Sequence, residues 1–273
     1  MDAPDGLPPG VPPELAAALA GSTVHPVDDG RARAEVWRVE HPDRGRRYLK
    51  RTAPADAADP WEGGTAVEAE RLRWLAGRVA VPSVVAHATA TDGSGWLLTE
   101  ALGGADATDP VHHGAPERLV TALAQGLRRF HEALSIDACP FDTRLDVRLA
   151  AARQRIAAGR VDADDFDPLH RGQTPDDLLA VIEALRPPGD EDLVVVHGDY
   201  SFPNVILDRG EVIGYVDLGR CGVADRYLDL AVAATSIARN LGGHAVGPFF
   251  EAYGIEWPDV VKLELYVLLD ELF

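Results

Sequence analysis

Three polar side chains near residue 200 have the types and spacing that phosphoryl transfer requires. An apolar run ends at Val196 and leads to Asp199, Asn204 follows five positions later, and a short hairpin then returns the chain to Asp217. Phosphoryl transfer needs a carboxylate that accepts the proton of the attacking hydroxyl, and oxygen ligands for a divalent metal that faces the phosphates. Asp199 suits the first task. Asn204 and Asp217 supply oxygens of the kind that Mg²⁺ prefers.

The order of these residues is that of a kinase catalytic loop followed by a metal-binding Asp-x-Gly. Such a site also needs a cation on the phosphates and a group that holds the cation. Lys50 ends a short strand-like segment and Glu68 lies on the helix that follows, so we expect an ion pair between them. Taken alone, each residue is better explained as a solvated surface side chain, and the presence of Asp199, Asn204 and Asp217 downstream favours the pair. Residues 28–36 occupy the position of a phosphate-binding loop, but they contain one glycine and no G-x-G-x-x-G.

Composition limits the class of protein. The chain has 273 residues, of which 46% are hydrophobic, enough for one large domain or two lobes that share a cleft. Its formal net charge is −18, with 44 acidic against 26 basic residues. This balance argues against nucleic acid as a partner, because phosphate binding needs basic surface, and we expect none. A polycationic substrate would be attracted by this charge, although acidic surface also serves solubility.

The cysteines and the N-terminal sequence indicate the compartment. Cys139 and Cys221 lack the spacing of a disulfide framework or a zinc site. The N-terminus has neither the basic nor the apolar segment of a secretory signal, and no apolar run approaches the length of a membrane span. We expect a cytoplasmic protein with no membrane association.

The periodicity of apolar residues divides the chain into a β-rich first region and a helical second region. The first region contains alternating segments at 34–40 and 47–50 around a turn, further strands at 84–89 and 96–99, and one helical segment at 65–76. From about residue 105 the spacing becomes helical, and the loops and short strands around Asp199 interrupt it. The predicted helices are 117–134, 144–158, 176–185, 224–240 and 258–272. No internal repeat is present.

Two acidic groups are left without a clear role by these patterns. Asp270 and Glu271 lie at the end of a predicted helix, where the helix dipole opposes negative charge unless a cation is near. The segment 161–168 contains four aspartates. From the residues alone, a substrate site and a solvated surface are equally good interpretations.

The motifs as a set resemble those of the aminoglycoside phosphotransferases, and specifically the class that modifies the 3′-hydroxyl of kanamycin- and neomycin-type antibiotics. The resemblance covers nearly the whole chain. Its most specific parts are His197-Gly-Asp199 with Pro203-Asn204, the segment 217–227, and the closing Leu-Leu-Asp-Glu-Leu-Phe of 268–273. It implies an α+β, two-lobed protein-kinase-like fold, with a small β-rich N-terminal nucleotide-binding lobe at 1–101 and a larger, mainly helical lobe at 102–273 that binds the aminoglycoside.

The resemblance also implies roles for individual residues. ATP and Mg²⁺ are the expected cofactors. Asp199 would be the catalytic carboxylate, Asn204 and Asp217 the metal ligands, and Lys50, Glu68 and the hinge residues Thr99 and Ala101 the nucleotide-binding set. The expected antibiotic-binding residues are Asp164, Asp167, Arg220, Glu271 and Phe273. Carboxylates suit this task, because aminoglycosides carry several ammonium groups.

The expected activity is ATP-dependent phosphorylation of an aminoglycoside 3′-hydroxyl, which confers antibiotic resistance. One alternative is a kinase of the same fold that acts on another small alcohol or antibiotic. A second alternative is a nucleotide-binding pseudoenzyme, against which the presence of Asp199, Asn204 and Asp217 argues. The sequence leaves open which aminoglycosides are accepted, whether GTP replaces ATP, and whether the protein is a monomer or a weak dimer.

Overall fold

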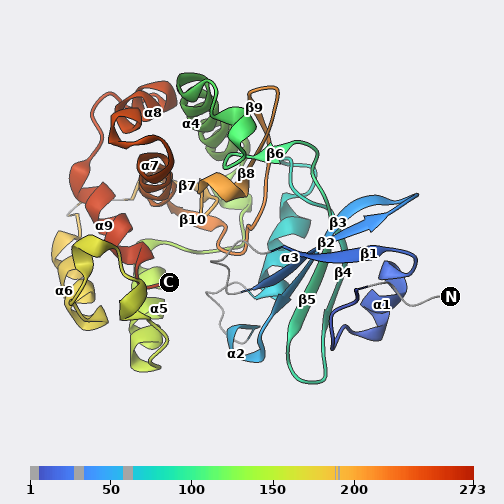
Figure 1. Ribbon diagram of the computed structural model, residues 1–273. Coiled ribbons are helices and arrows are strands. Elements are labelled where there is room, and N and C mark those ends of the chain that lie inside the picture. Colours follow the sequence, from blue (N-terminus) through green and yellow to red (C-terminus); the bar gives the residue numbers. More distant parts are fainter. Residues whose placement is uncertain (1–5, 28–33, 58–63, 188, 190) are drawn as a thin grey trace. The chain divides into compact units, whose positions relative to one another are not determined.

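The structure is a computed structural model that describes residues 6–27, 34–57, 64–187, 189 and 191–273. These residues fall into two compact units. The first contains residues up to Gly103 together with a later segment, Gly214–Arg220. The second contains Gly104–Ile213 and Cys221–Phe273. One unit is built on a sheet and the other mainly on helices, as expected for an α+β protein (Figure 1).

The first unit is built on a five-stranded antiparallel sheet in the order β1-β2-β3-β5-β4. The hairpin predicted around residues 41–45 is present between its second and third strands, with His41 opposite Gly45. The strands are β1 (Thr23–Val27), β2 (Glu35–His41), β3 (Gly45–Thr52), β4 (Val84–Thr89) and β5 (Gly95–Glu100). The helices of this unit are α1 (Pro13–Leu19), α2 (Pro54–Ala57) and α3 (Thr65–Leu75).

Helices α1 and α3 cover opposite faces of this sheet (Figure 1). Leu49 of β3 and Leu98 of β5 belong to a buried cluster with Leu15 of α1. Since neighbouring side chains of a strand point to opposite faces, Lys50 must project to the other face. That is the face on which α3 lies, so the strand geometry directs Lys50 toward this helix.

The second unit is mainly helical. Apolar residues at helical spacing, such as Leu119, Leu123 and Leu127 of α4, are buried in its core. Its helices are α4 (Pro116–Ala133), α5 (Leu145–Ala157), α6 (Pro175–Leu185), α7 (Tyr227–Leu241), α8 (Val246–Tyr253) and α9 (Val260–Asp270). Short 3₁₀ turns lie at Pro110–His112, Ile136–Ala138, Ala163–Asp165, Pro168–His170, Phe202–Asn204 and Gly243–Ala245. None of the helices in the described ranges has the length and apolar character needed to cross a membrane.

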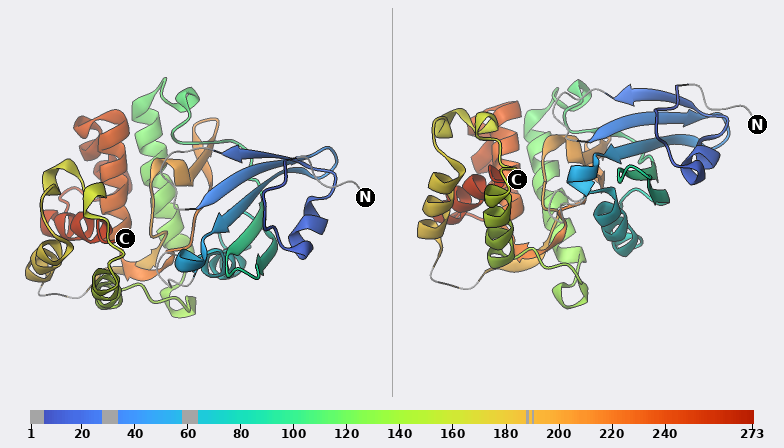
Figure 2. Two further views of the ribbon diagram at one scale, coloured as in Figure 1. Left: turned by 60° about the horizontal axis from the view of Figure 1, so that its bottom comes forward. Right: turned by 90° about the horizontal axis from the view of Figure 1, so that it is seen from below.

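Short strands lie within this helical framework, which Figure 2 shows from two further directions. The loop around Asp199 follows one of these strands. Strand β7 (Leu193–Val196) pairs with β10 (Gly222–Asp225), while β6 (Ala105–Asp106), β8 (Val205–Asp208) and β9 (Glu211–Tyr215) form a second small sheet. Within β9 the chain passes from the second unit back to the first.

The structure corrects the predicted helix 224–240. Ala224 and Asp225 belong to β10, where they pair with Val194 and Leu193, and α7 begins only at Tyr227. Pairing with β7 therefore overrides the local helical spacing of these residues. Helix α8 and strand β1 were not predicted. Both are short, and short elements give a weak periodic signal.

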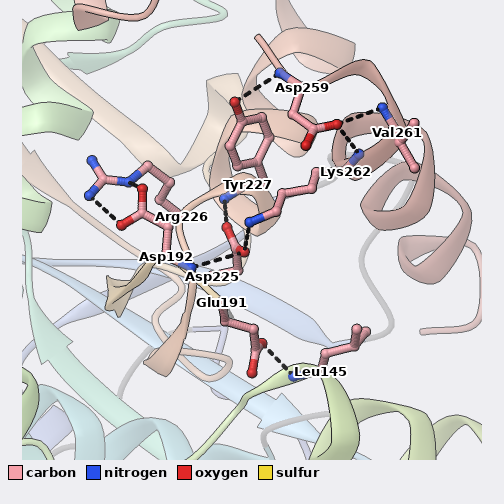
Figure 3. Close-up of polar contacts among 9 residues, drawn as sticks. All are labelled: Leu145, Glu191, Asp192, Asp225, Arg226, Tyr227, Asp259, Val261 and Lys262. Atoms are coloured by element: carbon pink, nitrogen blue, oxygen red, sulfur yellow. Dashed lines mark hydrogen bonds and ion pairs between the residues drawn. The ribbon is translucent and has the colours of Figure 1, made fainter. Parts of the chain in front are cut away.

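Buried Asp225 joins the elements at the base of α7 (Figure 3). Its carboxylate accepts hydrogen bonds from the backbone N–H groups of Tyr227, at 3.0 Å, and Asp192, at 3.2 Å. It also forms a 2.6 Å ion pair with Lys262 of α9. Asp259 caps the first turn of α9 by accepting from the N–H groups of residues 261 and 262. These contacts fix the start of α7, which carries residues that hold the Asp199 loop.

Candidate active site

Asp199 lies in a tight loop that begins where the buried strand β7 ends. Gly198 has φ +91°, a conformation that glycine adopts without steric cost. The amide nitrogen of Asn204 donates to the backbone oxygen of Asp199 at 3.0 Å and to its Oδ2 at 2.9 Å. Asp199 and Asn204 are therefore neighbours, as their spacing predicts. Within the described residues no hydrogen bond reaches Asn204 Oδ1, so this oxygen is available to a further partner.

A buried carboxylate, Asp229 of α7, holds the start of this loop. Its side chain has no exposed surface. Oδ2 accepts from the backbone N–H of His197 at 2.7 Å, and Oδ1 accepts from that of Gly198 at 2.8 Å. His131 Nε2 donates to Oδ2 at 2.9 Å, and His131 Nδ1 lies 2.8 Å from the hydroxyl of Tyr253. The buried charge thus has three donors, which buried ions need for stability.

Two further contacts fix the remainder of the loop. The hydroxyl of Tyr200 donates to the backbone oxygen of Leu123 on α4 at 2.9 Å. The N–H of Phe202 donates to Ser236 Oγ on α7 at 3.0 Å. Helices α4 and α7 therefore support the loop. The position of Asp199 depends on these tertiary contacts as well as on its local sequence.

Within the first unit, Lys50 contacts two carboxylates. Its Nζ lies 2.9 Å from Glu68 Oε2 and 2.7 Å from Asp217 Oδ1. The structure therefore contains the expected Lys50–Glu68 ion pair. The side chain of Lys50 is 23% exposed and that of Glu68 only 8%. Burial alone would lower the pKa of Lys50, but the charges of Asp217 and Glu68 outweigh burial and raise this pKa. The raised pKa favours the charged form of Lys50.

Asp217 has an unusual backbone conformation. Its φ is +57°, in the left-handed region that residues with a β-carbon seldom adopt. Strain of this kind persists where surrounding structure enforces it, and it is frequent at functional sites. Asp217 also lies in the segment that returns from the second unit to the first, where Tyr215 N–H donates to Ala80 O at 3.0 Å.

The expected hinge residues lie at the end of β5. Thr99 is buried and pairs with Tyr48 of β3. Ala101 N–H donates to the carbonyl of Arg46 at 3.1 Å, so the donor expected to meet an adenine ring has a partner in the same unit. A base that used this N–H would have to replace that bond. Residues 28–33 of the expected phosphate loop lie outside the described residues.

In the second unit, one part of the expected antibiotic site is assembled. The N–H of Asp167 donates to Glu271 Oε2 at 3.0 Å, although the two residues are far apart in sequence. Arg239, at the end of α7, lies 3.2 Å from Asp167 Oδ2. The N–H of Leu169 and this guanidinium lower the pKa of Asp167, whereas partial burial raises the pKa of Glu271. The acidic loop and the end of the chain therefore form one charged cluster.

Phe273 is buried against two arginines of α5. The guanidinium carbon of Arg148 lies 4.4 Å from the centre of the Phe273 ring, and that of Arg155 lies 5.4 Å from it. Arg155 Nε also donates to the backbone oxygen of Leu272 at 2.9 Å. The aromatic ring of Phe273 thus packs inside the protein, against the guanidinium groups of Arg148 and Arg155.

The other two expected antibiotic-binding residues have different surroundings. Asp164 lies exposed in the 3₁₀ turn Ala163–Asp165, where its N–H donates to Asp162 Oδ1 at 3.0 Å. Arg220 is half-buried at the end of the segment Gly214–Arg220. Sequence reasoning missed the supporting residues Arg239, Asp229 and His131. Only the place of Arg239 in the last turn of a predicted helix, where a cation is favoured, offered a signal.

The described residues contain no group of three or more His, Cys, Asp and Glu side chains arranged around a metal. This finding is compatible with Mg²⁺, which keeps several waters and takes one or two protein carboxylates. The chemistry of the two expected ligands, each considered within its own unit, also suits Mg²⁺. Asp217 carries a carboxylate, and the amide nitrogen of Asn204 donates to Asp199, which leaves its amide oxygen without a hydrogen-bond partner among the described residues.

Comparison with known proteins identifies the family. Residues 23–264 match the model of the phosphotransferase enzyme family, and the chain belongs to this family. An aminoglycoside 3′-phosphotransferase of Streptomyces fradiae is 39% identical over 261 residues, covering 91% of this chain and 94% of the relative. An aminoglycoside 3′-phosphotransferase of Escherichia coli is 35% identical over 247 residues, covering 89% and 88%.

Solved structures confirm the two-lobed, kinase-like α+β fold. The crystal structure of an aminoglycoside-3′-phosphotransferase of type VIII matches with a TM-score of 0.83 and 36% identity, covering 95% of this chain and 97% of that one. An aminoglycoside phosphotransferase from Streptomyces rimosus, in complex with ADP and streptomycin, matches with a TM-score of 0.73 and 28% identity, covering 94% and 95%.

Proposed function

We propose that this chain transfers the γ-phosphoryl group of ATP to the 3′-hydroxyl of aminoglycoside antibiotics and thereby confers resistance to them. The observation that carries this proposal is the similarity, along nearly the whole chain, to relatives named aminoglycoside 3′-phosphotransferase. The intact set of Asp199, Asn204 and Asp217 supports an active enzyme over a nucleotide-binding pseudoenzyme.

In the proposed mechanism, Asp199 accepts the proton of the 3′-hydroxyl. The oxygen of that hydroxyl then forms a bond to the γ-phosphorus, while the bond between this phosphorus and the bridging oxygen breaks and ADP leaves with the electron pair. Asn204 supports the geometry, because its amide nitrogen donates to Asp199 Oδ2 and so fixes the orientation of the carboxylate. Positioning of this kind supplies much of the rate in phosphoryl transfer.

The nucleotide would be bound chiefly by the first lobe, residues 1–101. Lys50 would contact the phosphates and Glu68 would hold it in place, an arrangement that their 2.9 Å ion pair supports. Thr99 and Ala101 would meet the adenine through their backbone. Asn204 and Asp217 would hold Mg²⁺, which when bound neutralises charge on the phosphates.

The antibiotic would be bound by carboxylates of the second lobe. Asp167 and Glu271 already lie together, and the lowered pKa of Asp167 keeps it ionised to attract ammonium groups. Asp164, Arg220 and Phe273 complete the proposed set. We place the enzyme in the cytoplasm, where ATP is available to it.

A turnover assay tests this function. Purified protein with Mg²⁺ and ATP should release ADP when kanamycin B is added, and should not respond to 3′-deoxykanamycin B, which lacks only the acceptor oxygen. Mass spectrometry should then find kanamycin B carrying one added phosphoryl group. Equal ADP release with both antibiotics would favour a different hydroxyl. No stimulation by any aminoglycoside would favour the alternative of a kinase for another small alcohol.

A further inference from the structure

Two arginines of α5 are almost completely buried. Arg148 is 2% exposed and Arg155 is 3% exposed. They are seven residues apart, close to two helical turns, and so lie on one face of the helix. Burial of a guanidinium is unfavourable unless its charge and its N–H groups find partners. Two such groups on one helix face therefore indicate a specific structural task.

Both arginines meet the same partner, Phe273. The ring lies 4.4 Å from Arg148 and 5.4 Å from Arg155, measured from ring centre to guanidinium carbon. Such contacts between a cation and an aromatic face are stronger when both groups are removed from water. Arg155 also donates from Nε to Leu272 O at 2.9 Å and from Nη2 to Phe273 O at 3.3 Å. Figure 1 shows the C end of the chain beside α5.

These contacts are needed because α9 ends at Asp270. Beyond it, the N–H groups of the last two residues make turn hydrogen bonds, from Leu272 N to Leu269 O at 3.3 Å and from Phe273 N to Asp270 O at 3.1 Å. Glu271 lies between the helix end and the residues that Arg155 holds. Its carboxylate accepts from Asp167 N–H, and this contact requires the segment to keep its direction.

We propose that Arg148 and Arg155 are positioning residues for antibiotic binding: they clamp Leu272 and Phe273 so that the carboxylate of Glu271 stays beside the acidic loop. This inference rests on the proposed function, and it assigns the arginines no contact with substrate. The ring of Phe273 acts as the anchor of the segment, and Glu271 is the group presented to an ammonium of the antibiotic.

Conservative variants separate this role from general stability. Arg155→Lys keeps the charge but loses the fork of donors, and Phe273→Leu keeps an apolar side chain but loses the aromatic face. Each should raise the KM for kanamycin about tenfold, while the KM for ATP changes by less than about twofold. Phe273→Tyr, which keeps a ring, should give a lower kanamycin KM than Phe273→Leu. The matched control is Arg153→Lys, on the same helix but 52% exposed, which should behave as the unaltered protein.

A second measurement needs no substrate. If the clamp fixes Glu271, then hydrogen exchange at the Asp167 amide should accelerate in Arg155→Lys and Phe273→Leu but not in Arg153→Lys. Unchanged exchange at Asp167, or equal increases in both KM values, would overturn the clamp. If the unaltered protein releases no ADP with kanamycin, the proposed function fails instead, and the exchange measurement still decides whether the arginines position Glu271.

Discussion

Replacement of Asp229 by alanine should destabilise the second unit severely. The change removes both carboxylate oxygens from a side chain with no exposed surface. It leaves three donors without their acceptor, namely the N–H groups of His197 and Gly198 and the Nε2–H of His131. All three lie at the base of the loop that carries Asp199, so stability and activity should fall together.

The expected magnitude follows from these three hydrogen bonds. A buried donor left without an acceptor costs about 1–3 kcal/mol, so three give roughly 3–9 kcal/mol. A water in the space left by the carboxylate would satisfy some of them, which brings the expected loss to about 3–5 kcal/mol. Asp229→Asn keeps one acceptor oxygen and should lose about 1–3 kcal/mol. A typical domain has only about 5–15 kcal/mol in total.

Urea unfolding followed by far-ultraviolet circular dichroism measures these losses, because that signal comes mainly from helices. Asp259→Ala is the matched control. It also removes an aspartate that accepts two backbone N–H groups, at 3.0 and 3.1 Å, but at the start of α9. Loss of such a helix cap costs about 1 kcal/mol.

The reasoning about Asp229 would be refuted by a loss no larger than that of Asp259→Ala. Failure of Asp229→Ala to fold, beside a folded Asp259→Ala and a weakened but folded Asp229→Asn, would agree with it. In the Asn variant, the fold decrease in kcat should exceed the fold change in the KM for ATP or for the antibiotic, because the loop that carries Asp199 loses part of its support.

Three further predictions concern other parts of the molecule. Lys50→Ala should lower kcat/KM for ATP by about 10- to 150-fold, the value of one charge-assisted hydrogen bond. Glu68→Gln should lower kcat/KM for ATP by a smaller factor. Steady-state kinetics with varied ATP measure both effects, and an unchanged kcat/KM in Lys50→Ala would contradict the proposed phosphate contact. For Glu271, whose pKa is raised above its ordinary 4.5, stability is lost as pH rises through the folded pKa. The unfolding free energy of Glu271→Gln minus that of the unaltered protein should therefore rise as pH increases above 4.5 and then reach a plateau. Urea titrations at several pH values measure this difference, and a difference that does not vary with pH would contradict the raised pKa. Gly126→Ala should lower the free energy of unfolding by about 1–3 kcal/mol, because its new methyl group would lie 2.9 Å from the Tyr200 hydroxyl. Helix propensity alone predicts the opposite, so a higher free energy of unfolding in urea titrations would show that the structure relaxes around the methyl group.

The sequence predicts those parts of the site that local spacing determines. Asp199 follows an apolar strand and Asn204 follows within a few residues, so their proximity is set by a short loop. The Lys50–Glu68 pair was also predictable. A strand lysine and a glutamate on a nearby helix meet when the helix packs on the sheet face to which the lysine points. The hairpin around residues 41–45 has the same local origin.

Contacts between distant segments were not predictable in the same way. Asp229 meets His131 across 98 residues of sequence, and Asp167 meets Glu271 across 104. No periodicity links such residues, so sequence alone left Asp229 unnoticed. Residues 224 and 225 were assigned to a helix because their pairing with β7 depends on tertiary structure. Arg148 and Arg155 look like surface residues of a charged helix until the end of the chain is seen to pack on them.

The role of Asp199 is the claim on which the proposed mechanism depends most directly. Turnover of kanamycin by Asp199→Ala should be compared with that of the unaltered protein, with antibiotic affinity measured separately by calorimetry. Loss of the group that accepts the hydroxyl proton should lower kcat by about 10²- to 10⁴-fold, while the Kd for kanamycin changes by less than about threefold. A variant whose kcat remains close to that of the unaltered protein would contradict the mechanism.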